Sequence, residues 1–267
     1  RVDFNGNYTY QVRGQAPCAA DMATVSITVN PAPYAGTSVS IVRCSNDAAF
    51  TLISQLGGTP DSGGTWTGPG GAAFPGGTFT PGVTTPGLYT YTVTALSPCA
   101  PAVATVSVAV VTAPRAGVGS TYTVCSSDGV FSLFNHLTGT PDVGGTWTGP
   151  SGPVPSGTFN PGVSVPGAYI YLVVGSSPCA NATATVTVAV VQAGNAASNG
   201  AVTLCSTSPN EDLFAHLGGT PSTGGVWTKP GGGVLAGGIY HPADPLDPAG
   251  VYTYTITGTS PCPNVTA

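Results

Sequence analysis

Short segments that alternate apolar and polar residues recur along the chain, separated by clusters of glycine and proline. One such segment, Gly-Leu-Tyr-Thr-Tyr-Thr-Val at residues 87–93, has counterparts at residues 6–12, 167–173 and 250–256. A second segment, Ala-Thr-Val-Ser-Val-Ala-Val, follows a Pro-Cys pair in the same order in successive copies. Alternation with a period of two indicates β-strands. We therefore expect a hairpin rich in β-branched residues in each copy.

The three tryptophans, Trp66, Trp147 and Trp227, occupy one repeated position at separations of 81 and 80 residues. Each follows a Gly-Thr-Pro turn and a Gly-Gly pair, and a fixed period of this kind indicates a tandem array. One repeat holds about seven short strands with turns every 8–12 residues, which is typical of a β-sandwich. Two leucines four residues apart, Leu133 and Leu137, predict a short helical turn in the same repeat.

The repeat boundaries divide the chain into four parts. Residues 1–31 match the C-terminal part of a truncated repeat, and they precede the first repeat (32–113), the second repeat (114–193) and the third repeat (194–267), which lacks its last strand. Residues 22–29 are of the kind that would follow Ala267. Either the chain continues in the same repeat on both sides or a neighbouring subunit donates the missing strands, and we favour a longer continuous chain.

Composition narrows the function classes. Charged residues make up only 6% of the chain, against roughly 25% in typical soluble domains. Five basic and ten acidic residues leave no basic patch, so nucleic-acid binding is not expected. No apolar run approaches the ~20 residues of a membrane helix, so this segment is not expected to insert into a membrane. The 39 glycines and 26 prolines fall at repeating turn positions, which argues for folded repeats rather than disorder.

The recurring blocks Gly-Gly-Thr-Trp-Thr-Gly-Pro, Pro-Gly-x-Tyr-x-Tyr-x-Val and Ser-Pro-Cys resemble the immunoglobulin-like repeats of giant Bacteroidetes surface proteins. This resemblance covers essentially the whole chain. It implies an all-β fold of tandem immunoglobulin-like β-sandwich domains with a repeat of about 80 residues. Those proteins are cell-surface adhesins and fibre-like proteins, often exported by the type IX system and described as gliding-motility-associated. The resemblance therefore implies a secreted, extracellular or cell-surface protein.

The aromatic residues of each repeat are expected to be structural. A tryptophan in mid-strand between two turns fits the core of a sandwich better than a sugar-stacking platform. One tyrosine of each Tyr-x-Tyr pair is expected to form a tyrosine corner while its neighbour points to the other face. The expected core aromatics are Trp66, Trp147, Trp227, Tyr89, Tyr91, Tyr169, Tyr171, Tyr252 and Tyr254.

Seven cysteines in regular register suggest an oxidising compartment and structural disulfides. The simplest pairing lies within repeats, as Cys44–Cys99, Cys125–Cys179 and Cys205–Cys262, with Cys18 left for a partner upstream. In immunoglobulin topology, however, the first turn and the last hairpin tip lie at opposite poles, too far apart for the ~5.5 Å that separates bonded Cα atoms. If the first strand spans the whole sandwich, Cys44 would meet Cys179 and Cys125 would meet Cys262, so that the bonds connect neighbouring repeats. Both pairings stay open at this point.

Catalytic chemistry is not expected. His136 and His216 share one repeat position, which holds Gln55 in the first repeat, so neither has the recurrence of a catalytic base. His241 lies near Asp244 and Asp247 in the loop 239–250, where a metal site is conceivable. Three prolines in this loop instead favour a stiff connector. We expect no enzyme activity, no cofactor and no metal site.

The sequence thus predicts a structural segment of an extracellular fibre or adhesin stalk, built of rigid, disulfide-stabilised immunoglobulin-like repeats. Its expected partners are copies of itself, through association into fibres or a longer chain of repeats. The alternative is a ligand-binding adhesin module that recognises a glycan or protein through its loops. The loop 239–250 departs most from its counterparts, so it is the place to look for such a role.

Overall fold

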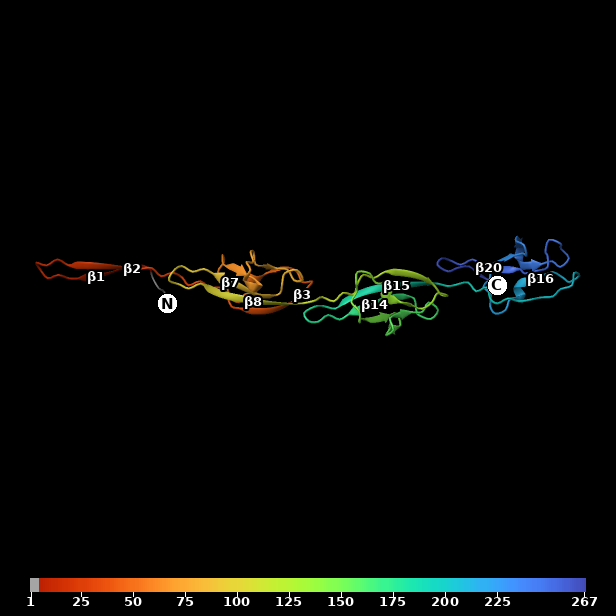
Figure 1. Ribbon diagram of the computed structural model, residues 1–267, viewed down its shortest axis with the longest axis horizontal. Helices are drawn as coiled ribbons and strands as arrows, with labels where there is room; N and C mark the ends of the chain where they lie inside the picture. The colour runs from red at the N-terminus through yellow and green to blue at the C-terminus, as the bar shows by residue number, and fades with distance from the viewer. Residues whose placement is uncertain (1–4) are drawn as a thin grey trace. The chain divides into compact units, whose positions relative to one another are not determined.

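The computed structural model describes residues 5–267; Arg1 and the next three residues of the truncated repeat lie outside the described part. Its regular structure is almost entirely β-strand, with a few one-turn 3-10 helices, as the coloured ribbon of Figure 1 shows. The chain forms two compact units. Unit 1 comprises Arg1–Ala113 and Gly175–Ala180, and unit 2 comprises Pro114–Val174 and Asn181–Ala267.

Unit 1 begins with an antiparallel hairpin of β1 (Gly6–Val12) and β2 (Asp21–Ile27). This is the hairpin expected from the alternating segments, and Tyr8 is paired with Val25 and Tyr10 with Ala23. Every residue of the two strands is exposed. Because its apolar side chains are not buried, this hairpin is expected to be only marginally stable in water, as two-stranded hairpins alone are.

The first repeat, also in unit 1, has one four-stranded sheet and one short two-stranded sheet. Its larger sheet has the order β3-β8-β7-β5, and the last strand, β8, pairs antiparallel with β7 and parallel with the first strand, β3. The smaller sheet is β4-β6. The elements are β3 (Val39–Cys44), β4 (Phe50–Thr51), η1 (Leu52–Gln55), β5 (Thr65–Thr67), η2 (Pro69–Gly71), β6 (Thr78–Phe79), β7 (Gly87–Val93) and β8 (Ala102–Val111).

The second repeat, in unit 2, has the same arrangement with one added edge strand. Its larger sheet has the order β12-β11-β14-β15-β9, and β15 again lies between an antiparallel and a parallel neighbour. The short helix η3 confirms the helical turn predicted near Leu133. The elements are β9 (Thr121–Cys125), β10 (Phe131–Ser132), η3 (Leu133–His136), β11 (Thr146–Gly149), β12 (Gly152–Pro153), β13 (Thr158–Phe159), β14 (Gly167–Val173) and β15 (Ala182–Val191).

The third repeat completes unit 2 with a smaller sheet of order β18-β17-β20-β21. Within residues 194–267, no strand corresponds to β3 or β9, and β21 holds only two residues. The elements are β16 (Glu211–Asp212), η4 (Leu213–His216), β17 (Val226–Thr228), β18 (Val234–Leu235), η5 (Ala236–Gly238), β19 (Ile239–Tyr240), β20 (Thr253–Ile256) and β21 (Val265–Thr266).

Three separate hydrophobic cores form, one inside each repeat. In each core the tryptophan ring packs on the second tyrosine of the Tyr-x-Tyr pair. The two ring centroids are 4.9 Å apart in the first and second repeats and 5.1 Å apart in the third. The inward residues of the last strand close the cores of the first two repeats, where Val106 and Val186 are fully buried. The predicted fold class, all-β with tandem immunoglobulin-like β-sandwiches, is confirmed. The boundaries near residues 32, 114 and 194 remain predictions.

Candidate functional site

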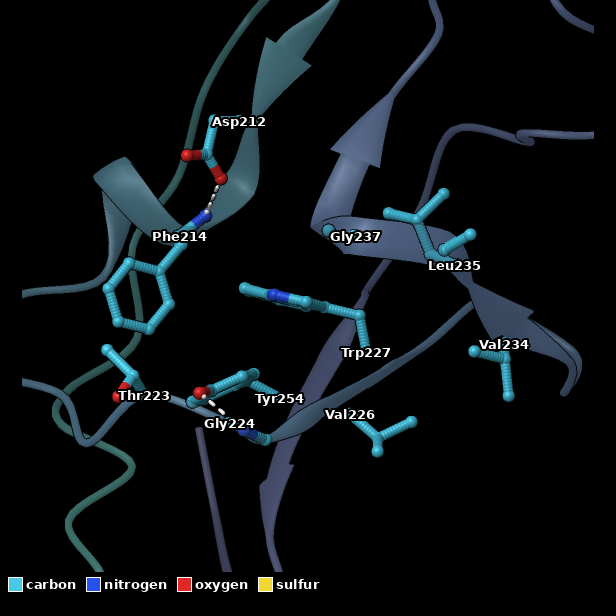
Figure 2. Close-up of a pocket in the computed structure, with 13 residues that line it drawn as sticks. Asp212, Phe214, Thr223, Gly224, Val226, Trp227, Val234, Leu235, Gly237 and Tyr254 are labelled. Carbon is cyan, nitrogen blue, oxygen red and sulfur yellow. Dashed lines mark hydrogen bonds between the residues drawn. The ribbon is translucent and has the colours of Figure 1, made fainter.

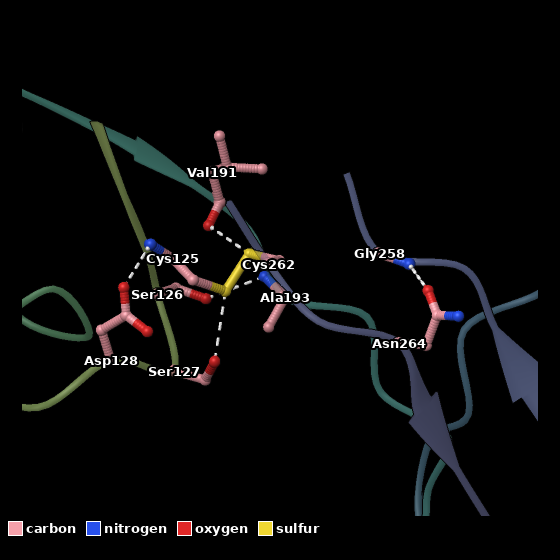
Figure 3. Close-up of a disulfide and its surroundings, with 9 residues drawn as sticks. All are labelled: Cys125, Ser126, Ser127, Asp128, Val191, Ala193, Gly258, Cys262 and Asn264. Carbon is pink, nitrogen blue, oxygen red and sulfur yellow. Dashed lines mark hydrogen bonds between the residues drawn. A yellow bond between two sulfur atoms is a disulfide. The ribbon is translucent and has the colours of Figure 1, made fainter. Parts of the chain in front are cut away.

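A disulfide in unit 2 joins Cys125, at the end of β9, to Cys262, at the tip of the hairpin before β21 (Figure 3). The two Cα atoms are 4.8 Å apart. The amide of Cys125 donates to the Asp128 carboxylate at 2.9 Å, which fixes the turn that follows the strand. Sγ of Cys262 lies 3.3 Å from the carbonyl oxygen of Val191, the last residue of β15. The bond therefore forms where the ends of two parallel strands converge.

Unit 1 contains the same arrangement around Cys44 and Cys179, whose Cα atoms are 5.0 Å apart. The amide of Cys44 donates to Asp47 at 2.9 Å, and Sγ of Cys179 lies 3.4 Å from the carbonyl oxygen of Val111. We call this set the cysteine joint: a first-strand cysteine, the carbonyl that ends the adjacent last strand, and a hairpin-tip cysteine. Its recurrence with the same contacts marks it as a built feature of the repeat.

The pairing within repeats is not the one the structure has. Cys44 and Cys179 bond each other, as do Cys125 and Cys262, so Cys44–Cys99, Cys125–Cys179 and Cys205–Cys262 do not form. The physical reason is the parallel pairing of β3 with β8. It places Cys44 opposite Val111 at one end of β8, whereas Cys99 precedes Ala102 at the other end, roughly 33 Å away at ~3.3 Å per residue.

Three cysteines are free in the structure, among them Cys99 and Cys205, which the pairing within repeats would place in disulfides. Cys18 and Cys205 are exposed, and Cys99 is half-buried. Sγ of Cys99 lies 3.5 Å from the carbonyl oxygen of Asn30, the same contact that Cys179 and Cys262 make. Cys99 thus has the surroundings of a hairpin-tip cysteine in a joint.

The expected core aromatics are buried, except Tyr252, which is partly exposed. The Tyr89 hydroxyl donates to the carbonyl of Thr85 at 2.6 Å and forms the tyrosine corner. The Tyr91 hydroxyl donates to the carbonyl of Asp61 at 2.7 Å and accepts from the amide of Gly64 at 2.9 Å. The expectation that the neighbour points to the other face was wrong, because strand residues two apart share a face. Burial raises the pKa of Tyr89, which keeps its hydroxyl a donor.

Each tryptophan borders an open pocket, shown for the third repeat in Figure 2. The pocket beside Trp227 has a volume of about 380 Å³. Gly238 lines the pocket. A Cβ at this position would lie 2.7 Å from Nε1 of the indole, so a larger residue would not fit without a shift. Phe214 and Tyr254 also line it, and Tyr254 packs on the indole ring. With Trp227 only 7% exposed, its ring face is unavailable for stacking on a sugar, which supports the core assignment.

The loop 239–250 of the third repeat is organised by Asp247, whose side chain is buried. Nζ of Lys229 lies 2.5 Å from one carboxylate oxygen, and Nδ1 of His241 lies 2.8 Å from the other. The hydrogen bond from Lys229 lowers the pKa of Asp247 to about 2. Asp244 instead accepts a hydrogen bond from the amide of Leu246. Within residues 5–267 no cluster of His, Cys, Asp and Glu could hold a metal ion.

The other two histidines lie in separate places. The His136 ring stacks on Tyr122 with centroids 4.1 Å apart, and burial lowers its pKa. Nε2 of His216 lies 2.7 Å from the Glu211 carboxylate. The His136 ring thus packs on an aromatic side chain, whereas the His216 ring pairs with a carboxylate.

Sequence reasoning missed two polar features. The Lys229–Asp247 pair had no repeat counterpart to reveal it. The second is the aspartate that accepts a hydrogen bond from the cysteine amide in the turn after the first strand, and the Cys-Ser-x-Asp pattern at residues 44–47 and 125–128 was its signal. At residues 205–208 Ser208 takes the place of the aspartate and accepts from Cys205 at 3.0 Å.

These observations define a chain of immunoglobulin-like β-sandwich repeats with disulfides, an architecture suited to a structural or adhesive module. No family profile matches the chain, and no curated protein matches it. Among solved structures, it is similar to the I-band fragment I67–I69 from titin, at 16% identity and a TM-score of 0.38, over 70% of this chain and 75% of that chain. It is also similar to extracellular domains 3–5 of Drosophila OTK, at 17% identity and a TM-score of 0.29, over 70% of this chain and 71% of that chain. No role is transferred from these likenesses.

No helix within the described residues is long and apolar enough to cross a membrane.

Proposed function

We propose that this chain is a structural segment of an extracellular fibre or adhesin stalk, of the type its repeats resemble in Bacteroidetes surface proteins. The observation that supports this role is the recurring cysteine joint. Each joint bonds the first strand of one repeat to the hairpin tip of the next, as Cys44–Cys179 and Cys125–Cys262. The repeats are thereby connected by a second covalent path besides the backbone.

Such a joint suits a protein that carries load. A chain of repeats joined by single linkers would concentrate bending and proteolysis at the linkers, which are the least protected backbone. Bonding the hairpin tip to the preceding repeat restrains that linker, and in the second joint Ser126 also accepts a hydrogen bond from the linker amide of Ala193 at 2.9 Å. Structural disulfides persist in oxidising compartments, which agrees with a secreted, cell-surface location.

A second candidate function is a ligand-binding adhesin module. The feature that favours it is the loop 239–250 with its buried Asp247, because the other two repeats have no such charged cluster and carry glycine where the third has Lys229. A glycan or a protein would contact the exposed side of this loop. Catalysis forms no part of either proposal.

Immunoelectron microscopy of the native source cells tests the structural role. Antibodies raised against the oxidised chain should label extended fibres on intact, unpermeabilised cells. Labelling that appears only after permeabilisation would contradict the proposal. A glycan array tests the alternative. The loop 239–250 is replaced by the shorter equivalent loop of the second repeat, and glycan binding that is lost in this variant would favour the adhesin role. Replacement of the equivalent loop in the first repeat is the matched control.

A further inference from the structure

The pockets beside the three tryptophans share one set of walls. Their volumes are about 490, 270 and 380 Å³ in the first, second and third repeats. One wall of each is the second tyrosine of the Tyr-x-Tyr pair, and another is a glycine with positive φ next to the indole nitrogen. These glycines are Gly77, Gly157 and Gly238, at which a Cβ would lie 2.7, 3.1 and 2.7 Å from Nε1. Glycine thus leaves the nitrogen edge of the ring uncovered in every repeat.

The indole N–H in each pocket is a donor without an acceptor. The three tryptophans are only 9%, 7% and 7% exposed, so each is more than nine-tenths buried. No residue within the range 5–267 accepts a hydrogen bond from Nε1 of Trp66, Trp147 or Trp227, yet no fully buried polar side-chain atom in that range lacks a partner. The nitrogen therefore reaches the open space of the pocket. Because a buried tryptophan N–H usually has a partner, this edge of the ring is suited to an acceptor from outside the chain.

A side-chain oxygen, which we call the rim oxygen, lines each pocket at the residue before the 3-10 helix. It belongs to Thr51, Ser132 or Asp212, which occupy one repeat position. Among the described residues the hydroxyls of Thr51 and Ser132 have no hydrogen-bond partner, and one oxygen of Asp212 accepts from the amide of Phe214 at 2.9 Å. Each of these side chains retains a lone pair for a further hydrogen bond. Every pocket therefore offers one donor and one acceptor.

The remaining side of each pocket is an apolar wall. In Figure 2 the indole of Trp227 points across the pocket toward Phe214, with Gly237 on one side and Tyr254 on the other. Phe134 takes the place of Phe214 in the second repeat, and Ile53 does so in the first. The described residues that line the first two pockets include no Lys, Arg, Asp or Glu. The complementary ligand is therefore a small uncharged group with an acceptor, a donor and an apolar end.

An acetamide group has this set of features. Its carbonyl oxygen accepts a hydrogen bond, its N–H donates one, and its methyl group is apolar. We propose that each pocket binds the N-acetyl group of an amino sugar. The carbonyl accepts from the indole N–H, the amide N–H donates to the rim oxygen, and the methyl group packs on the apolar wall. The tryptophan recognises the sugar through its N–H edge while its ring face stays packed on the core tyrosine.

The size of the pockets favours a sugar over a peptide as the source of the amide. An acetamide ends in its methyl group, whereas a peptide amide continues into the chain on both sides and needs room for both. The pocket beside Trp147 has only about 270 Å³. The acetamide fills this space while the sugar ring lies at the mouth of the pocket.

This binding activity is additional to the structural role and does not depend on it. The sites are also separate from the loop 239–250, which the second candidate function would use. Two of the three pockets lie in other repeats, so replacing that loop should leave sugar binding at Trp66 and Trp147 intact.

The test is an NMR titration of the isotope-labelled, oxidised full chain with N-acetylglucosamine. The chain has three tryptophans, so each indole N–H signal reports on one pocket. All three signals should shift downfield and saturate as the sugar is added. Glucose, which lacks the acetamide, is the matched control and should leave them in place. A glycine tripeptide capped at both ends tests the peptide source and should bind more weakly. The signals are assigned with Trp66→Phe, Trp147→Phe and Trp227→Phe, each of which removes one of them.

Variants of the rim oxygen test the second hydrogen bond. Thr51→Val and Ser132→Ala should each weaken binding about fivefold at their own pocket and leave the other two pockets unchanged. Thr105→Val, on the solvent face of β8, is the matched control and should have no effect. The third pocket should bind most tightly, because a hydrogen bond to the Asp212 carboxylate is charge-assisted. Asp212→Asn keeps an acceptor oxygen and should remove this advantage.

Four results would each overturn the proposal. They are the absence of a saturable shift at every indole signal, equal shifts with glucose, tighter binding of the capped peptide than of the sugar, and unchanged affinity in both Thr51→Val and Ser132→Ala. None of them alters the labelling of fibres on intact cells, so the sugar sites and the structural role can fail separately.

Discussion

Replacing Tyr171 by phenylalanine should destabilise the second repeat by about 2 kcal/mol. The Tyr171 hydroxyl donates to the carbonyl of Asp142 at 2.7 Å and accepts from the amide of Gly145 at 2.8 Å. The side chain is 2% exposed, and its ring packs on Trp147 with centroids 4.9 Å apart. Phenylalanine keeps the ring contact but removes both hydrogen bonds, each of which contributes about 1 kcal/mol net.

Three cores in one chain make global unfolding unsuitable as an assay, because it need not be two-state. Hydrogen exchange followed by mass spectrometry resolves each repeat separately. A loss of about 2 kcal/mol should speed exchange in residues 169–173 roughly thirtyfold, at 1.36 kcal/mol per tenfold change. Exchange in residues 89–93 of the first repeat should not change and provides an internal reference.

Two variants calibrate this result. Tyr169→Phe removes the single bond of 2.7 Å to the Val165 carbonyl and should speed exchange roughly fivefold, from about 1 kcal/mol. Tyr122→Phe changes a tyrosine that is 39% exposed and should have little effect. If Tyr171→Phe behaved like Tyr122→Phe, the two hydroxyl contacts would not hold the loop that precedes the Trp147 strand, and the reasoning would be refuted.

Two further results are expected. Trypsin should cut first after Arg13, next to the exposed hairpin strand β1, and slowly after Arg43, whose guanidinium donates a hydrogen bond to Gln55 at 2.9 Å. Equal cleavage rates at the two sites, measured by mass spectrometry, would contradict this difference in packing. The third repeat should lose stability below pH 4, because Lys229 lowers the pKa of Asp247 to about 2 in the folded state. The ionised carboxylate contributes its full stabilisation above the pKa of the unfolded chain, which is about 4. That contribution should disappear as the pH falls from about 4 to about 2 and should be absent in Asp247→Asn, whereas the same pH profile in both proteins would refute it.

The sequence was sufficient to predict the strands, because their alternation and their turns recur. Trp66 and its two counterparts, for example, were placed in the core from their mid-strand position alone, and each is buried. The tyrosine pairs were only half predicted, since the corner of Tyr89 has a local signature while the partner of Tyr91, Asp61, lies in another turn. Contacts between distant turns depend on how strands are ordered in the sheet.

The cysteine pairing shows the same limit more sharply. The regular register of the cysteines made Cys44–Cys99 the simplest pairing and left Cys44–Cys179 as the alternative. Only the parallel register of β3 with β8 decides between them, because it brings Cys44 to the end of the last strand. The Lys229–Asp247 pair lay beyond prediction for a different reason, since Asp247 belongs to the loop that departs most from its counterparts and Lys229 replaces a glycine of the other repeats.

Peptide mapping of the native protein under non-reducing conditions tests the central claim, that disulfides join successive repeats. One cross-linked peptide should contain Cys44 and Cys179, and another should contain Cys125 and Cys262. Alkylation before digestion prevents exchange, and a reduced sample is the control. Cross-linked peptides that pair Cys44 with Cys99 or Cys125 with Cys179, or free thiols at all four joint cysteines, would contradict the account.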